Sequence, residues 1–173
     1  PVHIAQWGTY LTTKEVTGKS ATVNIECTID NESGQNVSIK VVNRIYALDS
    51  EGERIDDEVA FAGPAETEIL AGTSSVVKFS TVLKNPRLWG PPPTQAPHMY
   101  VLVTDLVKSD QIIDTYESRF GIRSLRFDPE RGILVNGEHI PVRGVNQHHD
   151  LGALGAAFNM RAAERQLELL REM

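Results

Sequence analysis

Residues 21–30 read ATVNIECTID, an unbroken alternation of apolar and polar side chains. Successive side chains of a β-strand point to opposite faces of a sheet, so this period of two predicts a half-buried strand. Its buried face carries Val23, Ile25, Cys27 and Ile29. Because a single cysteine cannot form an internal disulfide, packing alone must hold any sheet built from this strand, with Cys27 as an inert buried thiol.

The same period continues on the C-terminal side of this stretch. A polar turn at residues 31–36 leads into a run from Val37 to Leu48, which we interpret as the next antiparallel strand. A weaker strand is expected at residues 55–61. Further strands are expected at residues 75–83, 98–107 and 112–123. Strands separated by turn clusters, without a helical period between them, predict an all-β fold, an immunoglobulin-like antiparallel β-sandwich at residues 1–124.

The pattern changes after Ser124. Asn136-Gly137 lies between two short apolar runs and predicts a hairpin with a type I′ turn, whose second arm continues into residues 143–145 as a further strand. After a loop rich in glycine and alanine, Asn159 is placed to cap an amphipathic helix. The apolar face of this helix consists of Met160, Ala163, Leu167, Leu170 and Met173. Because a single β-loop-α unit cannot complete a parallel sheet, we expect residues 125–173 to be the incomplete start of a second domain.

The charge and the distribution of apolar residues exclude two classes of binding partner. The formal net charge is −6 with both signs mixed along the chain, so we expect no nucleic acid partner. No apolar stretch is long enough to cross a bilayer, and the first ten residues show no targeting signal, so we expect no membrane partner. Both a periplasmic and a cytoplasmic location agree with these features.

Four stretches together resemble glycoside hydrolase family 2, and they occur in the order that the family shows. They are residues 85–89 (NPRLW), 98–102 (HMYVL), 120–123 (FGIR) and 135–148 (VNGEHIPVRGVNQH). The segment 148–152 (HHDLG) is most similar to the bacterial β-galactosidase branch, whereas glucuronidase and mannosidase branches share the architecture. The resemblance implies that residues 125–173 begin a (β/α)8 barrel.

The resemblance further implies a retaining glycosidase that acts on terminal β-galactosides or a similar β-glycoside. Retention needs two carboxyl groups about 5–5.5 Å apart, and the family's glutamates would lie beyond residue 173. We therefore expect no catalytic residue here, an inactive piece, and no cofactor or metal. Substrate-binding residues are expected at the carboxyl end of the first barrel strand: His148 and Asp150 foremost, with Asn146 and Arg143 helping to organise that rim.

Other interpretations remain beside this one. A non-catalytic sandwich module that binds glycans or proteins is the alternative function, and the segment from residue 143 to the helix argues against it. Trp7 and Trp89 are interpreted mainly as packing residues, with sugar stacking as the alternative. The unpartnered helix also predicts that the tail folds against the sandwich or pairs with a second copy, giving a homo-oligomer through the barrel segment.

Overall fold

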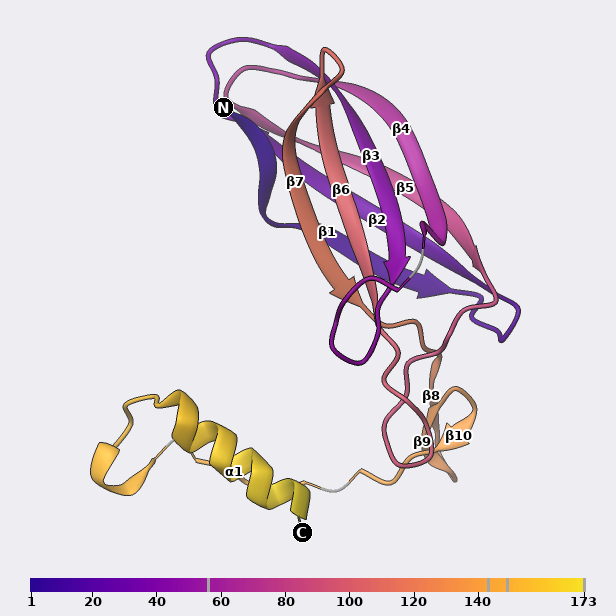
Figure 1. The fold of residues 1–173 in the computed structure, drawn as a ribbon, viewed down its shortest axis with the longest axis vertical. Coiled ribbons are helices and arrows are strands. Elements are labelled where there is room, and N and C mark those ends of the chain that lie inside the picture. The colour runs from indigo at the N-terminus through magenta and orange to yellow at the C-terminus, as the bar shows by residue number, and fades with distance from the viewer. Residues whose placement is uncertain (56, 143, 149, 173) are drawn as a thin grey trace. The chain divides into compact units, whose positions relative to one another are not determined.

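A computed structural model describes residues 1–55, 57–142, 144–148 and 150–172. The chain forms two compact units, Pro1–Ile140 and Pro141–Met173 (Figure 1). The strands of the first unit are β1 (Val2–Lys14), β2 (Ser20–Asn31), β3 (Val37–Ala47), β4 (Ala60–Ile69), β5 (Thr73–Lys84), β6 (Tyr100–Lys108), β7 (Gln111–Phe120), β8 (Leu125–Asp128), β9 (Gly132–Val135) and β10 (Glu138–His139). The second unit holds the 3₁₀ helix η1 (Gly152–Leu154) and the helix α1 (Met160–Glu172).

Two antiparallel sheets form the body of the first unit. One has the strand order β1-β2-β5 and the other β4-β3-β6-β7, while a third, small sheet has the order β10-β9-β8. β2 and β3, which we expected as consecutive antiparallel strands, lie in different sheets and do not pair with each other. The polar turn between them instead carries the chain from one layer to the other, which the alternation of each strand alone does not reveal.

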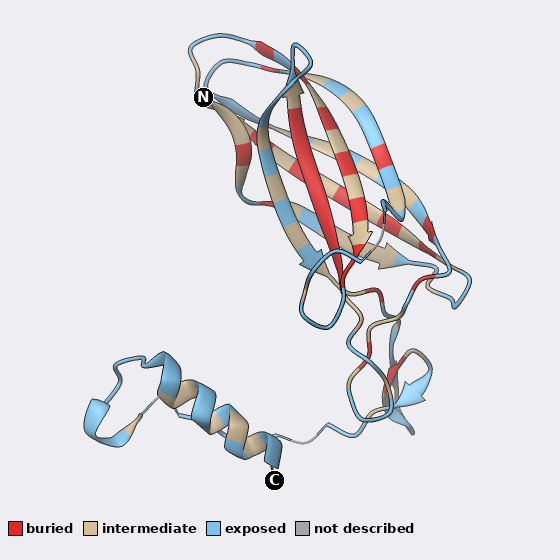
Figure 2. Cartoon of the chain, viewed as in Figure 1, coloured by how far each residue is buried: buried red, intermediate tan, exposed pale blue. Residues whose placement is uncertain are grey.

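The core lies between the two large sheets. Val23, Ile25, Cys27 and Ile29 are fully buried, which confirms the face predicted from the alternation. They pack against inward residues of the opposite sheet such as Ile45 and Leu106, and Figure 2 shows buried positions alternating along β3, whereas most of β6 is buried without a break. Burial, and secondarily the charge of Asp114, raises the pKa of the Cys27 thiol to about 12, so this cysteine is inert as a nucleophile.

Two strand predictions fail. The weak strand expected at residues 55–61 is wrong over most of that range: β4 begins at Ala60, residues 55 and 57–59 lie in no strand, and an isolated bridge joins Leu48 and Arg54 before them. β1 was not predicted, because the register shifts between Ile4 and Thr9 and interrupts the period of two. The remaining predicted strands correspond to β2, β3, β5, β6 and β7.

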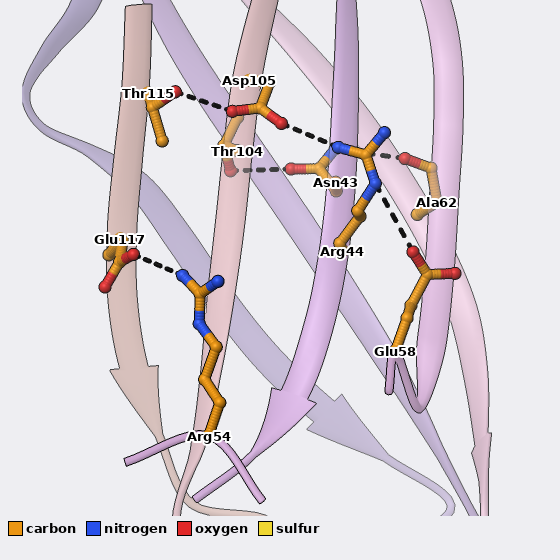
Figure 3. A network of polar contacts seen from close by, with 9 residues as sticks. All are labelled: Asn43, Arg44, Arg54, Glu58, Ala62, Thr104, Asp105, Thr115 and Glu117. Atoms are coloured by element: carbon orange, nitrogen blue, oxygen red, sulfur yellow. Dashed lines mark hydrogen bonds and ion pairs between the residues drawn. The ribbon is translucent and has the colours of Figure 1, made fainter. Parts of the chain in front are cut away.

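Polar groups tie the strands of the four-stranded sheet together (Figure 3). On the inner side, the Thr104 hydroxyl donates to Asn43 Oδ1 at 2.7 Å, and both side chains are fully buried. On the outer side, Asp105 accepts from Arg44 and from Thr115, each at 2.7 Å. Every buried side-chain nitrogen or oxygen among the described residues has a hydrogen-bond partner. Burial of these polar groups therefore does not incur the free-energy cost of an unsatisfied donor or acceptor.

The predicted Asn-Gly turn is confirmed. Asn136 and Gly137 have φ angles of 53° and 84°, the two positive values that a type I′ turn requires. The hairpin β9–β10 lies in the same compact unit as the sandwich, whereas we placed the domain boundary after Ser124. The cause is a set of hydrogen bonds from the Asn136 side chain, described below; the boundary between domains of a larger protein stays a prediction.

The second unit forms only part of the predicted β-loop-α element. No strand is present in residues 140–142 and 144–148, so the expected first barrel strand is not formed in the described residues. A parallel strand needs hydrogen-bonding neighbours, and the second unit supplies no other strand. The helix is confirmed: α1 begins at Met160, and Asn159 Oδ1 accepts from the Ala162 amide at 3.0 Å as an N-cap.

Candidate functional site

Three of the four stretches contribute to one joint within the first unit: residues 85–89, residues 120–123 and the Asn-Gly turn that opens residues 135–148. The Asn136 side chain donates to the carbonyl of Trp89 and to Gln95 Oε1, both at 2.8 Å, and its Oδ1 accepts from the Ser124 amide at 3.0 Å. The Trp89 amide in turn donates to the carbonyl of Ile122 at 2.8 Å. These residues therefore build a structural joint, which explains why they occur as a set.

Trp89 is the centre of this joint. The guanidinium of Arg123 lies over its ring, 4.8 Å from the centroid, and a Cβ on Gly121 would lie 2.7 Å from Trp89 Cβ. The close approach explains a glycine at position 121. Trp89 is therefore a packing residue, as predicted for it.

The predicted substrate-binding residues lie in the second unit. Asn146, His148 and Asp150 are all exposed, on a segment without regular structure. Arg143, and the neighbouring His149, lie outside the described residues. The predicted set is therefore available to solvent on one short stretch, and its role in binding sugar stays a prediction.

A side-chain hydrogen bond fixes this stretch to α1. Gln147 Nε2 donates to Gln166 Oε1 at 2.6 Å. These two glutamines line both of two adjacent hollows, one of about 460 Å³ that includes His148 and one of about 250 Å³ that includes Asn146. His148 and Asn146 therefore face different hollows, and the structure does not bring them together.

The Asp150 side chain accepts a hydrogen bond from a backbone amide of its own loop. Its Oδ1 accepts from the Gly152 amide at 3.0 Å at the start of η1, and the loop closes where the Leu151 amide donates to the carbonyl of Gly155 at 3.0 Å. A carboxylate used in this way shapes the loop beside His148. Its second oxygen, which makes no hydrogen bond to a described residue, is free to accept one.

Five residues that the sequence analysis did not select as site residues line the hollow of His148. They are Gln147, Leu151, Ala156, Phe158 and Gln166, alongside Ala163 and Leu167 of the predicted apolar face. Phe158 directly precedes the cap Asn159, and an apolar residue there often packs against the fourth helical residue, here Ala163. This arrangement is called a hydrophobic staple, and it is the sequence signal from which Phe158 could have been predicted.

Two glutamates of this unit are engaged in ion pairs. Glu164 and Glu168 both bind Arg161 Nη1, at 3.1 and 3.0 Å, on the exposed side of α1, and these bonds raise the pKa of Arg161. In the described part of the chain no three His, Cys, Asp or Glu residues gather as metal ligands. None of the described helices has the length and apolarity needed to cross a membrane.

Comparison with known proteins identifies the class. The sequence model of the family described as Glycosyl hydrolases family 2 matches residues 2–123, which is most of the chain. The chain therefore belongs to glycoside hydrolase family 2, as the four stretches indicated.

Individual relatives extend this similarity over the whole chain. Beta-galactosidase BoGH2A of Bacteroides ovatus is 38% identical over all 173 residues, which cover 19% of that protein. A beta-glucuronidase of Formosa agariphila is 32% identical over 87% of this chain and 15% of its own length. A solved family 2 member from Bacteroides cellulosilyticus matches with a TM-score of 0.78 and 29% identity over 99% of this chain and 22% of that one. The chain thus spans only a minor part of the relatives it matches.

Proposed function

We propose that this chain is the scaffold and one sugar-binding rim of a retaining glycosidase that hydrolyses terminal β-galactosides or a similar β-glycoside. The observation that carries the proposal is the 38% identity to a β-galactosidase over the entire chain, including the His148 segment. Relatives named as β-glucuronidases and other relatives named as β-galactosidases match at similar, lower identities, so the preference for a galactoside rests on that one relative.

In this proposal the first unit is an immunoglobulin-like sandwich and the second is the start of a (β/α)8 barrel. The strand orders β1-β2-β5 and β4-β3-β6-β7 support the first part, since seven antiparallel strands in two layers with crossing connections are typical of that fold. The capped helix α1 after the residues 133–145, whose sequence predicts a hairpin and a strand, supports the second. The missing strand would form once neighbouring barrel strands pair with residues 142–146.

His148 is the proposed sugar contact. It is exposed beside a largely apolar hollow, an arrangement in which an imidazole donates to a sugar hydroxyl while apolar side chains cover the ring carbons. A hydrogen bond that strengthens as positive charge develops at the anomeric carbon lowers the barrel enzyme's barrier without any proton transfer by His148. The chain alone contributes no nucleophile or general acid and is therefore inactive.

A panel of nitrophenyl glycosides on the full-length enzyme tests the proposal. We expect hydrolysis of the β-galactoside above the β-glucuronide, and a fall in kcat/KM of about tenfold to a thousandfold for His148→Ala, because the lost bond acts in the transition state. Glu164→Gln, on the exposed face of α1, is the matched control and should retain full activity. Equal activity of His148→Ala and the parent would refute the role of His148, and no hydrolysis of any β-glycoside would refute the function.

A further inference from the structure

Few hydrogen bonds hold the segment of residues 144–148, which carries His148. The segment forms no helix or strand, and it takes part in no backbone hydrogen bond among the described residues. Its one side-chain hydrogen bond among them runs from Gln147 Nε2 to Gln166 Oε1, at 2.6 Å. The place of His148, the next residue after Gln147, therefore depends on a side chain of α1.

Gln166 interrupts the less exposed side of α1. It is half-buried and lies one helical turn from the half-buried Ala163 and Leu170. A polar amide at such a position needs a hydrogen-bond partner, because burial of an unpaired amide costs free energy. Gln147 is that partner, and the Gln166 side chain makes no other hydrogen bond to a described residue. The contact therefore accounts for an amide where the helical period would allow an apolar side chain.

The same amide pair lies between the two hollows of the second unit. Both glutamines line the hollow of His148 and the hollow of Asn146. Neither amide is charged, so the pair holds the segment without placing a charge beside the imidazole. Because one planar peptide unit joins Gln147 to His148, fixing Gln147 restricts where the His148 side chain can lie.

We propose that Gln166 is a positioning residue that, through Gln147, holds His148 in place for its contact with the sugar. This inference rests on the proposed function of His148 and assigns a role to a residue that does not itself need to touch the substrate. A hydrogen bond that acts in the transition state requires a fixed geometry, and a displacement of about 1 Å can reduce the rate about a hundredfold. An otherwise unpaired segment would not provide that geometry by itself.

Backbone dynamics of the chain test the positioning without any substrate. Gln166→Met keeps the size of the side chain but removes the acceptor, and it should lower the ¹⁵N order parameter of the His148 amide from about 0.85 to below about 0.6. Gln166→Glu keeps an accepting oxygen and should retain the parent value. Arg165→Met, at an exposed neighbouring position of α1, is the matched control. Far-UV circular dichroism checks that α1 is folded in every variant.

An order parameter that is already low in the unaltered chain, or that Gln166→Met does not change, overturns the proposal. The proposed glycosidase function would remain standing in that case, because this measurement involves no hydrolysis.

Kinetics of the full-length enzyme connect the positioning to the reaction. Gln166→Met should lower kcat/KM for the β-galactoside about tenfold in the parent, but by less than about twofold in the His148→Ala enzyme, because Gln166 acts through His148. An equal loss in both backgrounds would indicate a merely structural effect and would overturn the proposal.

The two ideas fail in different ways. A normal loss for His148→Ala with no loss for Gln166→Met removes the positioning role alone. An unchanged kcat/KM for His148→Ala removes the proposed role of His148, and the positioning role with it.

Discussion

The strand β2 and the helix α1 have equally clear sequence patterns and opposite outcomes. The apolar face of β2 is fully buried, whereas Met160 and Leu167 on the apolar face of α1 are 65% and 60% exposed, and no residue of α1 is buried. The pattern of a segment predicts its local conformation, but burial depends on what other segments supply. The first unit contains both of the sheets that enclose its core. The second unit contains α1 but no second layer that covers the apolar face of this helix among the described residues.

The largest expected effect tests this difference in burial. Ile25→Ala removes a fully buried side chain between the two sheets and should lower the free energy of unfolding by about 2–5 kcal/mol. Leu167→Ala, of similar change in size on α1, should lower the free energy of unfolding of the sandwich by less than about 0.5 kcal/mol. Urea denaturation followed by tryptophan fluorescence measures both.

A large effect of Leu167→Ala would contradict the comparison, because it would mean that the face of α1 is covered in solution. Sedimentation of the unaltered chain separates the two ways of covering it: a concentration-dependent mass indicates the predicted pairing with a second copy, and a constant monomer mass indicates docking on the sandwich.

The second expected effect compares two glycines. Gly121→Ala would place a methyl 2.7 Å from Trp89 Cβ and should destabilise the joint by about 1–3 kcal/mol. Gly144→Ala, in the second unit, meets nothing within 4 Å and should leave stability unchanged. Thermal unfolding by circular dichroism measures both variants, and a milder effect at Gly121 than at Gly144 would contradict the joint described here.

Much of the sandwich could be predicted because its strands keep the period of two. Val23 to Ile29 and the turn at Asn136-Gly137 obey local rules that do not depend on the rest of the fold. β1 was missed for the opposite reason: its bulge around Trp7 and Gly8 breaks the period, and the bulge shows only in the pairing with β2, which is distant in sequence.

The candidate site was less predictable than the fold. The resemblance selected His148, but the side chains around it come from α1 and from the residue before its cap, as Gln166 and Phe158 show. The assignment of β2 and β3 to different sheets likewise depends on contacts distant in sequence. The alternation of either strand alone would be compatible with a place in either sheet.

The third expected effect concerns the cap of α1. Asn159→Ala removes the acceptor for the Ala162 amide and should reduce helix stability by about 1 kcal/mol. Because the second unit has little packing to compensate, α1 should lose helicity in far-UV circular dichroism while the sandwich unfolds at the same temperature. Asn159→Ser restores an acceptor and should restore the helix; a fall in the unfolding temperature of the sandwich would contradict the independence of the two units.

The smallest expected effect compares a carboxylate in each unit. Asp49 Oδ1 accepts from the amides of Glu51 and Glu53, at 2.9 and 2.8 Å, whereas Asp150 Oδ1 accepts from one amide, that of Gly152. The backbone hydrogen bond from Glu53 is the main cause that holds the pKa of Asp49 below its usual range. A depressed pKa in the folded state adds stability above the unfolded value of about 3.9, and this contribution is lost as the pH falls through the folded pKa.

Asp49→Asn should therefore lower the unfolding temperature slightly at pH 7 and make no difference at a pH below the folded pKa of Asp49, where the carboxyl of the parent is protonated too. Asp150→Asn is the control, and it should leave the sandwich unchanged at every pH because its single bond shapes only the loop before η1. Unfolding curves of the parent and Asp49→Asn that differ by the same amount from pH 7 to below pH 3 would show that the charge of Asp49 does not stabilise the loop.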